Sequence, residues 1–289
     1  MAKTVYIHRD QGMGDVIWIA PLVSHYLDLG CKVTVVSRFA NIFEQHPRIK
    51  RVGKASRFLR LKLRLFKLLR VPTYIDLNNS YEQEPMLHPV DAYSKRAGVH
   101  LVSRLPSAQL FLKHRSEPEA GEKGSIAFHI QAPSQKLSYR NVHGVDWLKL
   151  ALAMEELGYS CVELVAAEAG TKPILSKYVV HGVDNLFAQL DSFSYFVGLD
   201  SGPSHVAQVL GKPSVIFYGS VNPNLRSHVG ETLALQQPCD LAGCYHATKG
   251  YEGTPCVYEN DQTTPPCCTF TTDDVLLKVS AFFSESTEH

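Results

Sequence analysis

The fold is decided by the stretch Leu199-Asp200-Ser201-Gly202-Pro203-Ser204-His205-Val206-Ala207, followed by Gly211-Lys212-Pro213 and the apolar run Ser214-Val215-Ile216-Phe217-Tyr218. This stretch predicts a strand that ends at Asp200, a tight turn, a helix opened by Pro203 and a further strand. Proline suits the first position of a helix because its missing N–H is not needed there. Strands that alternate with helices in this way are typical of a parallel-sheet α/β protein.

The predicted helix start is suited to an anion. We expect the backbone N–H groups of Ser204, His205 and Val206 to be unpaired, and such groups bind phosphate or diphosphate. Asp200 precedes the helix and can accept hydrogen bonds from sugar hydroxyls. A diphosphate-binding site beside such a carboxylate predicts a nucleotide-sugar site. The alternative is an ordinary capped helix between two strands.

The same alternation continues along the chain in two blocks. The first block predicts strands at 5–8, 32–36 and 73–76 and helices at 15–29, 57–70 and 89–97. The second predicts strands at 125–130, 161–165, 196–199 and 214–218 and helices at 145–157, 169–178 and 203–210. A polar, breaker-rich linker separates the blocks at 114–124. We therefore expect two Rossmann-like parallel-sheet domains that face each other across a cleft.

The domain boundaries follow from these blocks. We expect an N-terminal, acceptor-side domain at 1–118 and a C-terminal, nucleotide-sugar-binding domain at 125–271, which includes a cysteine-rich loop at 239–268. A closing helix and tail follow at 272–289. No apolar run approaches the ~20 residues that span a bilayer. The first residues enter a strand without a secretory pattern, so we expect a cytoplasmic protein.

The net charge of +1 hides a basic segment. Residues 45–75 contain ten lysines and arginines and no acidic residue, which leaves 19 basic against 28 acidic residues elsewhere. On a helical wheel, one face of 57–70 carries Arg57, Arg60, Arg64, Lys67 and Arg70, and the other carries Leu61, Leu65, Phe66, Leu68 and Leu69. The segment predicts either a solvated amphipathic helix or a surface for an anionic acceptor or a membrane.

Asp15 marks the first helix of the chain as a candidate catalytic element. The stretch Gly12-Met13-Gly14-Asp15-Val16-Ile17 lacks the third small residue of a dinucleotide fingerprint. Asp15 also lies where a pyrophosphate would bind, and two anions do not share that place. We therefore exclude an NAD site. A carboxylate at a helix start stays ionised and can accept a proton from a substrate hydroxyl, although Asp15 can also be a simple helix cap.

Several motifs together resemble the family 9 glycosyltransferases, the heptosyltransferases of lipopolysaccharide synthesis. They are Gly12-Met13-Gly14-Asp15-Val16, Ala20-Pro21-Leu22, Lys32-Val33-Thr34-Val35-Val36, Pro47-Arg48-Ile49-Lys50-Arg51-Val52, the run from Asp200 to His205 with Gly211-Lys212-Pro213, and Tyr218-Gly219-Ser220-Val221-Asn222-Pro223. The similarity covers both halves of the chain in the right order. The chain departs from the family at 131–135, which lacks the usual glycine-rich form.

The resemblance implies a GT-B fold and inverting transfer of a sugar from a nucleotide diphosphate sugar, similar to ADP-heptose. The acceptor would be a hydroxyl of a glycan, lipopolysaccharide or protein. It implies that Asp15 is the general base and that Asp200 holds donor hydroxyls, and that Ser201, Gly202, Ser204 and His205 bind the diphosphate. Arg140 matches a cationic phosphate ligand, with Lys136 as its rival, and Glu168 is a candidate for the ribose. We expect no cofactor requirement for catalysis and no nucleic-acid partner.

Five cysteines lie close together near the carboxyl end. They are Cys239, Cys244, Cys256, Cys267 and Cys268. Their spacing is not that of a standard zinc ribbon. One branch of the family that modifies proteins has a four-cysteine iron site with different spacing. The interpretations left open are a structural zinc or iron, reduced structural thiols, or disulfides. None gives the cluster a catalytic role.

Two other functions remain open on the sequence. A nucleotide-sugar epimerase would need acid and base groups around the donor sugar itself, and no clear set is present. A non-catalytic nucleotide-sugar-binding protein would have no need of the Asp15 carboxylate. A lipid-linked acceptor would also bring a peripheral contact with the inner face of the membrane.

Overall fold

The chain divides into two compact units. The computed structural model describes residues 2–44, 46–53, 56–114, 123–131, 141–167, 172–228, 230–247, 256, 258 and 264–286. The first unit runs from Met1 to His114 and the second from Arg115 to His289. Within the described residues, no helix has the length and apolar character that a membrane crossing requires.

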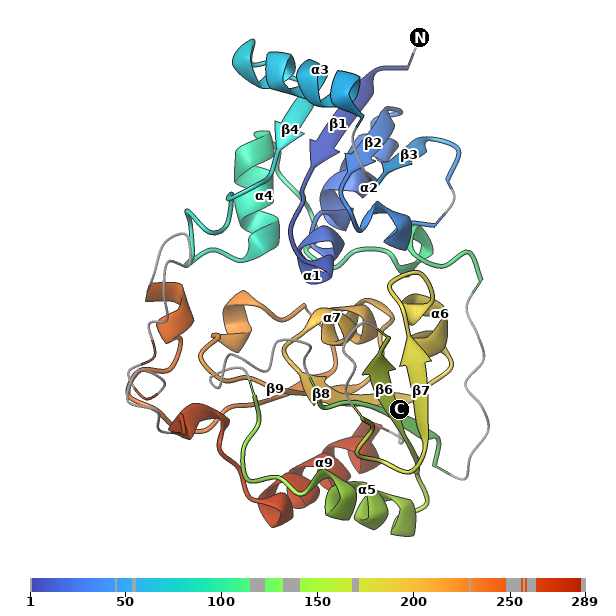
Figure 1. Cartoon of the computed structure of the whole chain (residues 1–289), viewed down its shortest axis with the longest axis vertical. Coiled ribbons are helices and arrows are strands. Elements are labelled where there is room, and N and C mark those ends of the chain that lie inside the picture. The colour runs from blue at the N-terminus through green and yellow to red at the C-terminus, as the bar shows by residue number, and fades with distance from the viewer. Residues whose placement is uncertain are drawn as a thin grey trace. The chain divides into compact units, whose positions relative to one another are not determined.

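The first unit is a parallel sheet with helices on it (Figure 1). Its strands lie in the order β3-β2-β1-β4 and are all parallel. They are β1 (Thr4–His8), β2 (Lys32–Val36), β3 (Ile49–Val52) and β4 (Tyr74–Asp76). The helices are α1 (Met13–Ile17), α2 (Ala20–Asp28), α3 (Arg57–Leu68) and α4 (Pro89–Ala97), with short 3-10 turns at Ala40–Ile42 and Ala108–Leu110.

Strand β1 divides the side chains of this unit between the two faces of its sheet. Val5 and Ile7 are buried, and successive residues of a strand point to opposite faces. Tyr6 therefore lies on the other face, where its ring meets Phe66 of α3 at 5.8 Å between centroids. Helix α3 is thus attached through Tyr6, on the face that also carries His8 at the end of the strand.

The second unit has a larger parallel sheet, in the order β10-β9-β8-β5-β6-β7. The strands are β5 (Ser125–His129), β6 (Ser160–Ala166), β7 (Tyr178–His181), β8 (Tyr195–Leu199), β9 (Ser214–Phe217) and β10 (Thr232–Leu235). The helices are α5 (Trp147–Glu156), α6 (Leu186–Asp191), α7 (Gly202–Val209) and α9 (Thr272–Ser286), with 3-10 turns at Pro223–Leu225, Cys244–Ala247 and Pro266–Cys268.

The core of the second unit forms where α5 and α9 pack on the sheet. Trp147 meets Phe217 edge to face, with ring centroids 5.4 Å apart, and Phe283 of α9 packs on Tyr195 at 4.6 Å. Figure 1 shows α6 and α7 on the opposite side of the sheet from these two helices. Every residue of β5, β8 and β9 is buried, as expected of strands covered on both faces.

Gly198 brings β8 against β5 near their carboxyl ends. A Cβ atom at this position would lie 2.8 Å from the carbonyl oxygen of His129 and 2.7 Å from the ring of Phe196. No larger residue fits without a shift of one strand. The close approach of the two strands therefore depends on this glycine.

The predicted α/β class with parallel sheets is confirmed, and most predicted elements are present. Two predictions are wrong in detail. The single helix expected at 15–29 is divided into α1 and α2, because Pro21 begins a new helix in its first turn. The helix expected at 169–178 is absent from its described part, where 174–177 form bends and Tyr178 begins β7.

Candidate functional site

In the second unit, the position where open parallel sheets bind ligands is at the centre of the sheet. The chain first adds β6 and β7 on one side of β5 and then β8, β9 and β10 on the other. In open parallel sheets, ligands bind at the carboxyl ends of the strands, where the order reverses in this way. Here those ends are His129, the last residue of β5, and Asp200 with Ser201, which follow β8.

His129 and Ser201 connect the two strand ends directly. The Ser201 hydroxyl lies 3.1 Å from Nδ1 of His129 and donates to the Leu199 carbonyl at 3.1 Å. Burial lowers the pKa of His129 to about 3, with a further contribution from His181, so the imidazole is neutral at pH 7. The link therefore positions the residue that precedes α7 without adding charge to the site.

Helix α7 begins at this edge with a capped first turn. The Ser204 hydroxyl accepts from the Ser201 N–H at 3.1 Å and donates to the Ser201 carbonyl at 2.7 Å. The His205 N–H donates to the same carbonyl at 3.3 Å, so the expectation that it is unpaired is wrong. This bond closes the first turn of the helix. What remains for a ligand is the positive end of the helix dipole, at the position that the sequence indicates.

Asp200 lies beside this helix start. Its Oδ1 is 3.9 Å from Nε2 of His205, and both side chains are nearly buried. Burial raises the pKa of Tyr218, and the neighbouring charge of Asp200 raises it further, so the phenol is neutral. The carboxylate thus lies near an imidazole and an uncharged phenol, and it can accept hydrogen bonds from ligand hydroxyls.

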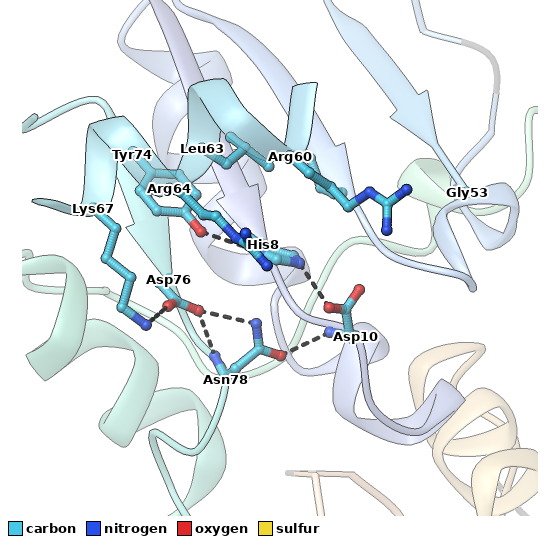
Figure 2. A pocket seen from close by; sticks show the side chains of 11 residues that line it. His8, Asp10, Gly53, Arg60, Leu63, Arg64, Lys67, Tyr74, Asp76 and Asn78 are labelled. Carbon is cyan, nitrogen blue, oxygen red and sulfur yellow. Dashed lines mark hydrogen bonds and ion pairs between the residues drawn. The ribbon is translucent and has the colours of Figure 1, made fainter. Parts of the chain in front are cut away.

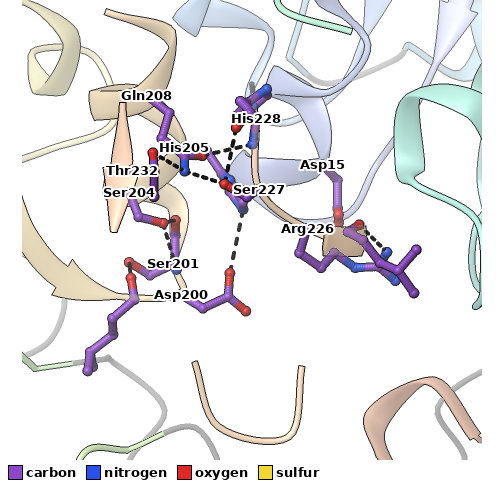
Figure 3. A network of polar contacts seen from close by, with 12 residues as sticks. Asp15, Asp200, Ser201, Ser204, His205, Gln208, Arg226, Ser227, His228 and Thr232 are labelled. Carbon is purple, nitrogen blue, oxygen red and sulfur yellow. Dashed lines mark hydrogen bonds and ion pairs between the residues drawn. The ribbon is translucent and has the colours of Figure 1, made fainter. Parts of the chain in front are cut away.

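A glutamine of α7 holds the loop that follows β9 (Figure 3). Nε2 of Gln208 donates to the hydroxyls of Ser227 at 2.8 Å and Thr232 at 3.2 Å, and its Oε1 accepts from the His228 N–H at 3.1 Å. The ring of His228 packs against His205 at 5.6 Å. Sequence reasoning missed Gln208, because nothing in its neighbours indicates that a polar side chain is buried there.

Asp15 of the first unit is held by two side chains that sequence reasoning also missed. Its Oδ2 lies 3.1 Å from Arg9, and its Oδ1 accepts from the Tyr81 hydroxyl at 2.7 Å. Arg9 is fully buried and makes a second ion pair with Glu82 at 2.6 Å. Burial opposes the charge of Arg9, but Tyr93, Asp15 and Glu82 raise its pKa, so it remains a cation.

Gly12 leaves room for the Asp15 carboxylate. A Cβ atom at Gly12 would lie 2.9 Å from Oδ2 of Asp15. Asp15 is in the first turn of α1, as the sequence predicts, and no side chain caps that helix at Gly12. The carboxylate is therefore oriented chiefly by Arg9 and Tyr81 rather than used as a cap.

A pocket of about 450 Å³ lies at the carboxyl ends of β1 and β4 (Figure 2). Residues of three kinds line it: cations from α3, polar residues from the strand ends, and a few apolar side chains. The polar residues form a chain in which His8 contacts Asp10 at 2.8 Å, the Asp10 N–H donates to Asn78 at 2.9 Å, and Asn78 donates to Asp76 at 2.9 Å.

The basic residues predicted as an anion surface divide into three groups. Arg60 and Arg64 line the pocket, and neither forms an ion pair with another described residue. Lys67 lines it too but donates to Asp76 at 2.5 Å. Burial opposes the charge of Asp76, yet Lys67 and Asn78 lower its pKa, so the pair is ionised. Arg57, at the exposed start of α3, does not line the pocket. Two arginines are thus available for an anion.

Comparison with known proteins identifies part of the second unit. Residues 146–235 match the sequence model of glycosyltransferase family 9 (heptosyltransferase). This segment belongs to family 9. It contains Asp200, Ser201, Gly202, Ser204 and His205, and the predicted membership and enzyme class, a glycosyltransferase, are confirmed on it. Asp15 lies outside the matched residues.

Solved structures of glycosyltransferases share the fold. E. coli heptosyltransferase WaaC with ADP is 16% identical with a TM-score of 0.58, over 81% of this chain and 93% of that one. E. coli ADP-heptose lps heptosyltransferase II is 15% identical with a TM-score of 0.56, over 99% of each. TibC, a bacterial iron-containing dodecameric glycosyltransferase from enterotoxigenic E. coli, is 14% identical with a TM-score of 0.69, over 98% of this chain and 76% of that one. The predicted GT-B class is therefore confirmed. No curated protein matches by sequence.

The five cysteines near the carboxyl end lie near one another, and no disulfide joins them in the described part of the chain. Burial raises the pKa of Cys244 to about 11, with contributions from Cys256, Cys267 and Cys239. A hydrogen bond from Cys268 lowers the pKa of Cys267. Thiols suit zinc or iron, but within the described ranges no group of three or more His, Cys, Asp or Glu is arranged to hold a metal. The metal stays a prediction, and no step of the reaction depends on it.

Three predicted donor ligands cannot be placed. Lys136, Arg140 and Glu168 lie outside the described residues. Their assignment to phosphate and ribose therefore stays a prediction from the family resemblance.

Proposed function

We propose that the chain transfers a heptose-like sugar from a nucleotide diphosphate sugar to a hydroxyl of a glycan acceptor, with inversion at the anomeric carbon. The observation that carries this proposal is the juxtaposition of Asp200 with the amino end of α7, at the strand-order reversal of the second unit. The relatives support the choice of donor, since WaaC is described with ADP and TibC in complex with ADP-D-beta-D-heptose.

Two kinds of contact bind the donor, one to its diphosphate and one to its hydroxyl groups. The diphosphate lies at the amino end of α7, with Ser201, Gly202, Ser204 and His205 around it, because the positive end of the helix dipole there suits an anion. Asp200 accepts hydrogen bonds from donor hydroxyls. Arg140 or Lys136 would add a cation at the phosphates, and Glu168 a ribose contact.

Asp15 is the proposed general base. Its carboxylate takes the proton of the acceptor hydroxyl while the oxygen forms a bond to the anomeric carbon. The bond from that carbon to the diphosphate oxygen breaks, and the electron pair leaves with the nucleoside diphosphate. The positive end of α7 stabilises the charge that develops on this leaving group. A single displacement inverts the configuration.

The acceptor is proposed to bind in the first unit. In the pocket of Figure 2, Arg60 and Arg64 can bind a phosphate or carboxylate of the acceptor. The hydrogen-bonded row of polar side chains that runs from His8 to Asp76 can bind its hydroxyl groups. Two arginines that have no ion partner among the described residues, beside hydroxyl-binding carboxylates, suit an anionic glycan. The proposed place of the reaction is the cytoplasm, at the inner face of the membrane if the acceptor is lipid-linked.

The experiment starts with a panel of nucleotide diphosphate sugars, read by the shift in melting temperature. Turnover of the best donor is then measured as nucleotide release for the wild type and for Asp15→Asn. Removal of a general base should lower the rate by ~10²–10⁴-fold and leave donor affinity unchanged. Wild-type turnover in the variant would make Asp15 a structural residue. Conversion of the donor sugar without nucleotide release would indicate an epimerase, and binding without turnover a binding protein.

A further inference from the structure

Helix α3 exposes its apolar row. The exposed fractions are 79% for Phe58, 67% for Leu61, 49% for Leu65, 78% for Leu68 and 64% for Leu69, the residue directly after the helix. Only Leu63 of α3 is buried. A helix on an α/β unit ordinarily turns its apolar stripe toward the core. Here the stripe is exposed instead.

The side of α3 that meets the sheet is a different one. Lys62 donates to the Tyr6 hydroxyl at 2.9 Å, and Phe66 packs on the Tyr6 ring. At about 100° per residue, the exposed apolar residues fall within an arc of roughly 100° that excludes Lys62, Leu63 and Phe66. The apolar row therefore points away from the sheet and does not stabilise the unit by packing on it.

Cations border this row on the same helix. Arg57, Arg60 and Arg64 follow it along one side, and Arg70 comes after its end. The segment 45–75, which contains α3, has no acidic residue. An exposed apolar row beside a row of cations is the composition of helices that lie in the headgroup region of anionic membranes.

We propose that α3 binds the surface of a bilayer that contains anionic phospholipid, with the apolar row inserted between the headgroups. Charge complementarity favours lipid over a second copy of the chain, because a two-fold contact through this face would bring two rows of arginines together. The proposal goes beyond the transfer reaction and does not depend on it. It also explains how a lipid-linked acceptor would come near the pocket, since Arg60 and Arg64 belong to the same helix.

Flotation with vesicles tests this surface. The full chain is mixed with vesicles of phosphatidylcholine alone or with phosphatidylglycerol added. The test variant is Phe58→Gln/Leu61→Gln/Leu65→Gln. Its matched control, Leu148→Gln/Leu152→Gln/Leu277→Gln, removes three leucines of α5 and α9 that are 44%, 51% and 69% exposed. Arg57→Gln/Arg70→Gln lowers the charge without altering the pocket.

The wild type and the matched control should float with the anionic vesicles and not with phosphatidylcholine. The apolar variant should lose about tenfold or more of its vesicle affinity. The arginine variant should bind more weakly, and added salt should weaken wild-type binding, because exposed charges are screened over ~8 Å at physiological ionic strength. Since the substituted side chains are exposed, the melting temperature should not change. If the triple variant fails to fold, Leu61→Gln/Leu68→Gln replaces it.

Equal flotation of the apolar variant and the wild type would overturn the proposal. A wild type that does not float with anionic vesicles would overturn it too. Light scattering identifies the other occupant. A wild type that self-associates, ignores vesicles and becomes monomeric in the apolar variant would make the face a contact between copies. Donor binding, measured on the same samples, is expected to be equal in all variants. Its loss would count against the donor assignment and not against this surface.

Discussion

At the scale of single residues, the environment of Asp15 shows how the carboxylate proposed as the general base is held in place. One oxygen faces a buried guanidinium and the other accepts from a phenol. Arg9 in turn is shared with Glu82 and lies 4.9 Å from the ring centroid of Tyr81. Because buried charges are costly unless they are paired, this group of side chains is a rigid unit rather than an adjustable one.

Tyr81 is expected to act through Asp15. Tyr81→Phe keeps the ring on Arg9 but removes the hydrogen bond to Oδ1, so the carboxylate can rotate away from its productive orientation. The turnover number should fall about tenfold, because small errors of orientation are costly in a proton transfer. Donor affinity should not change. Steady-state kinetics with a separate measurement of donor affinity checks both expectations.

Tyr93 gives the control for this prediction. Its ring also lies on Arg9, at 5.7 Å, and Tyr93→Phe leaves that contact in place. The Tyr93 variant should turn over like the wild type. A Tyr81→Phe enzyme with an unchanged turnover number would show that Arg9 alone orients Asp15.

At the scale of elements, the ends of β5 and β8 are coupled through His129. Its pKa falls from 6.5 in the unfolded chain to about 3 in the fold. Below pH 6.5, His129 therefore binds a proton in the unfolded state but stays unprotonated in the folded state. The stability due to neutral His129 is complete above pH 6.5 and is lost as the pH falls toward 3, by up to ~1.4 kcal/mol per pH unit.

Denaturant unfolding from pH 7 to pH 5 measures this effect. In His129→Asn, the free energy of unfolding should fall less steeply as the pH is lowered. The difference in slope should correspond to the uptake of about one proton. His100→Asn is the control, because His100 is exposed. Parallel pH profiles for the wild type and His129→Asn would mean that the buried imidazole is protonated in the fold.

The pocket beside α3 carries a prediction that separates its cations. Arg60→Gln/Arg64→Gln should raise the KM for an anionic acceptor about tenfold or more, since each charged hydrogen bond contributes ~1.5–3 kcal/mol. Donor affinity should stay the same. Lys67→Gln instead breaks the ion pair with Asp76 and should affect stability before recognition. Acceptor kinetics that respond to Lys67 and not to the arginines would contradict this assignment.

The elements that carry strong local signals could be predicted from the sequence. The bounds of α4 follow from Pro89 at its start and Gly98, in the left-handed region, after its end. The run from β8 to β9 is set by Pro203 and by apolar strands. Strands β3, β7 and β10 have exposed or half-buried residues and no clean alternation, so sequence patterns do not indicate them.

The candidate site divides in the same way. Asp15 and Asp200 were identifiable because each follows a strand and opens a helix. Arg9, Tyr81, His129 and Gln208 were not, because their partners are distant in the sequence: 66 residues separate Tyr81 from Asp15, and 72 separate Ser201 from His129. The exposure of the apolar row of α3 was also unpredictable, since a helical wheel does not say which face meets the sheet.

At the scale of the whole molecule, the two units repeat one topology. Each sheet places its first strand between its second and its fourth, so each unit has its own reversal of strand order. Both groups of candidate residues lie at these reversals, with His8 and Asp76 in the first unit and His129 and Asp200 in the second. Each unit thus has its own position for a ligand, which agrees with the proposal that the donor binds one unit and the acceptor the other.

The most direct test of the central claim is calorimetric binding of ADP-heptose and of ADP to the wild type and to Asp200→Ala. We predict that the wild type binds both. The variant should bind ADP as the wild type does, because the diphosphate contacts at α7 remain. It should bind ADP-heptose about tenfold more weakly, because the sugar hydroxyls lose their acceptor. A wild type that binds neither ligand, or a variant with unchanged affinity for ADP-heptose, would contradict the nucleotide-sugar site proposed for the second unit.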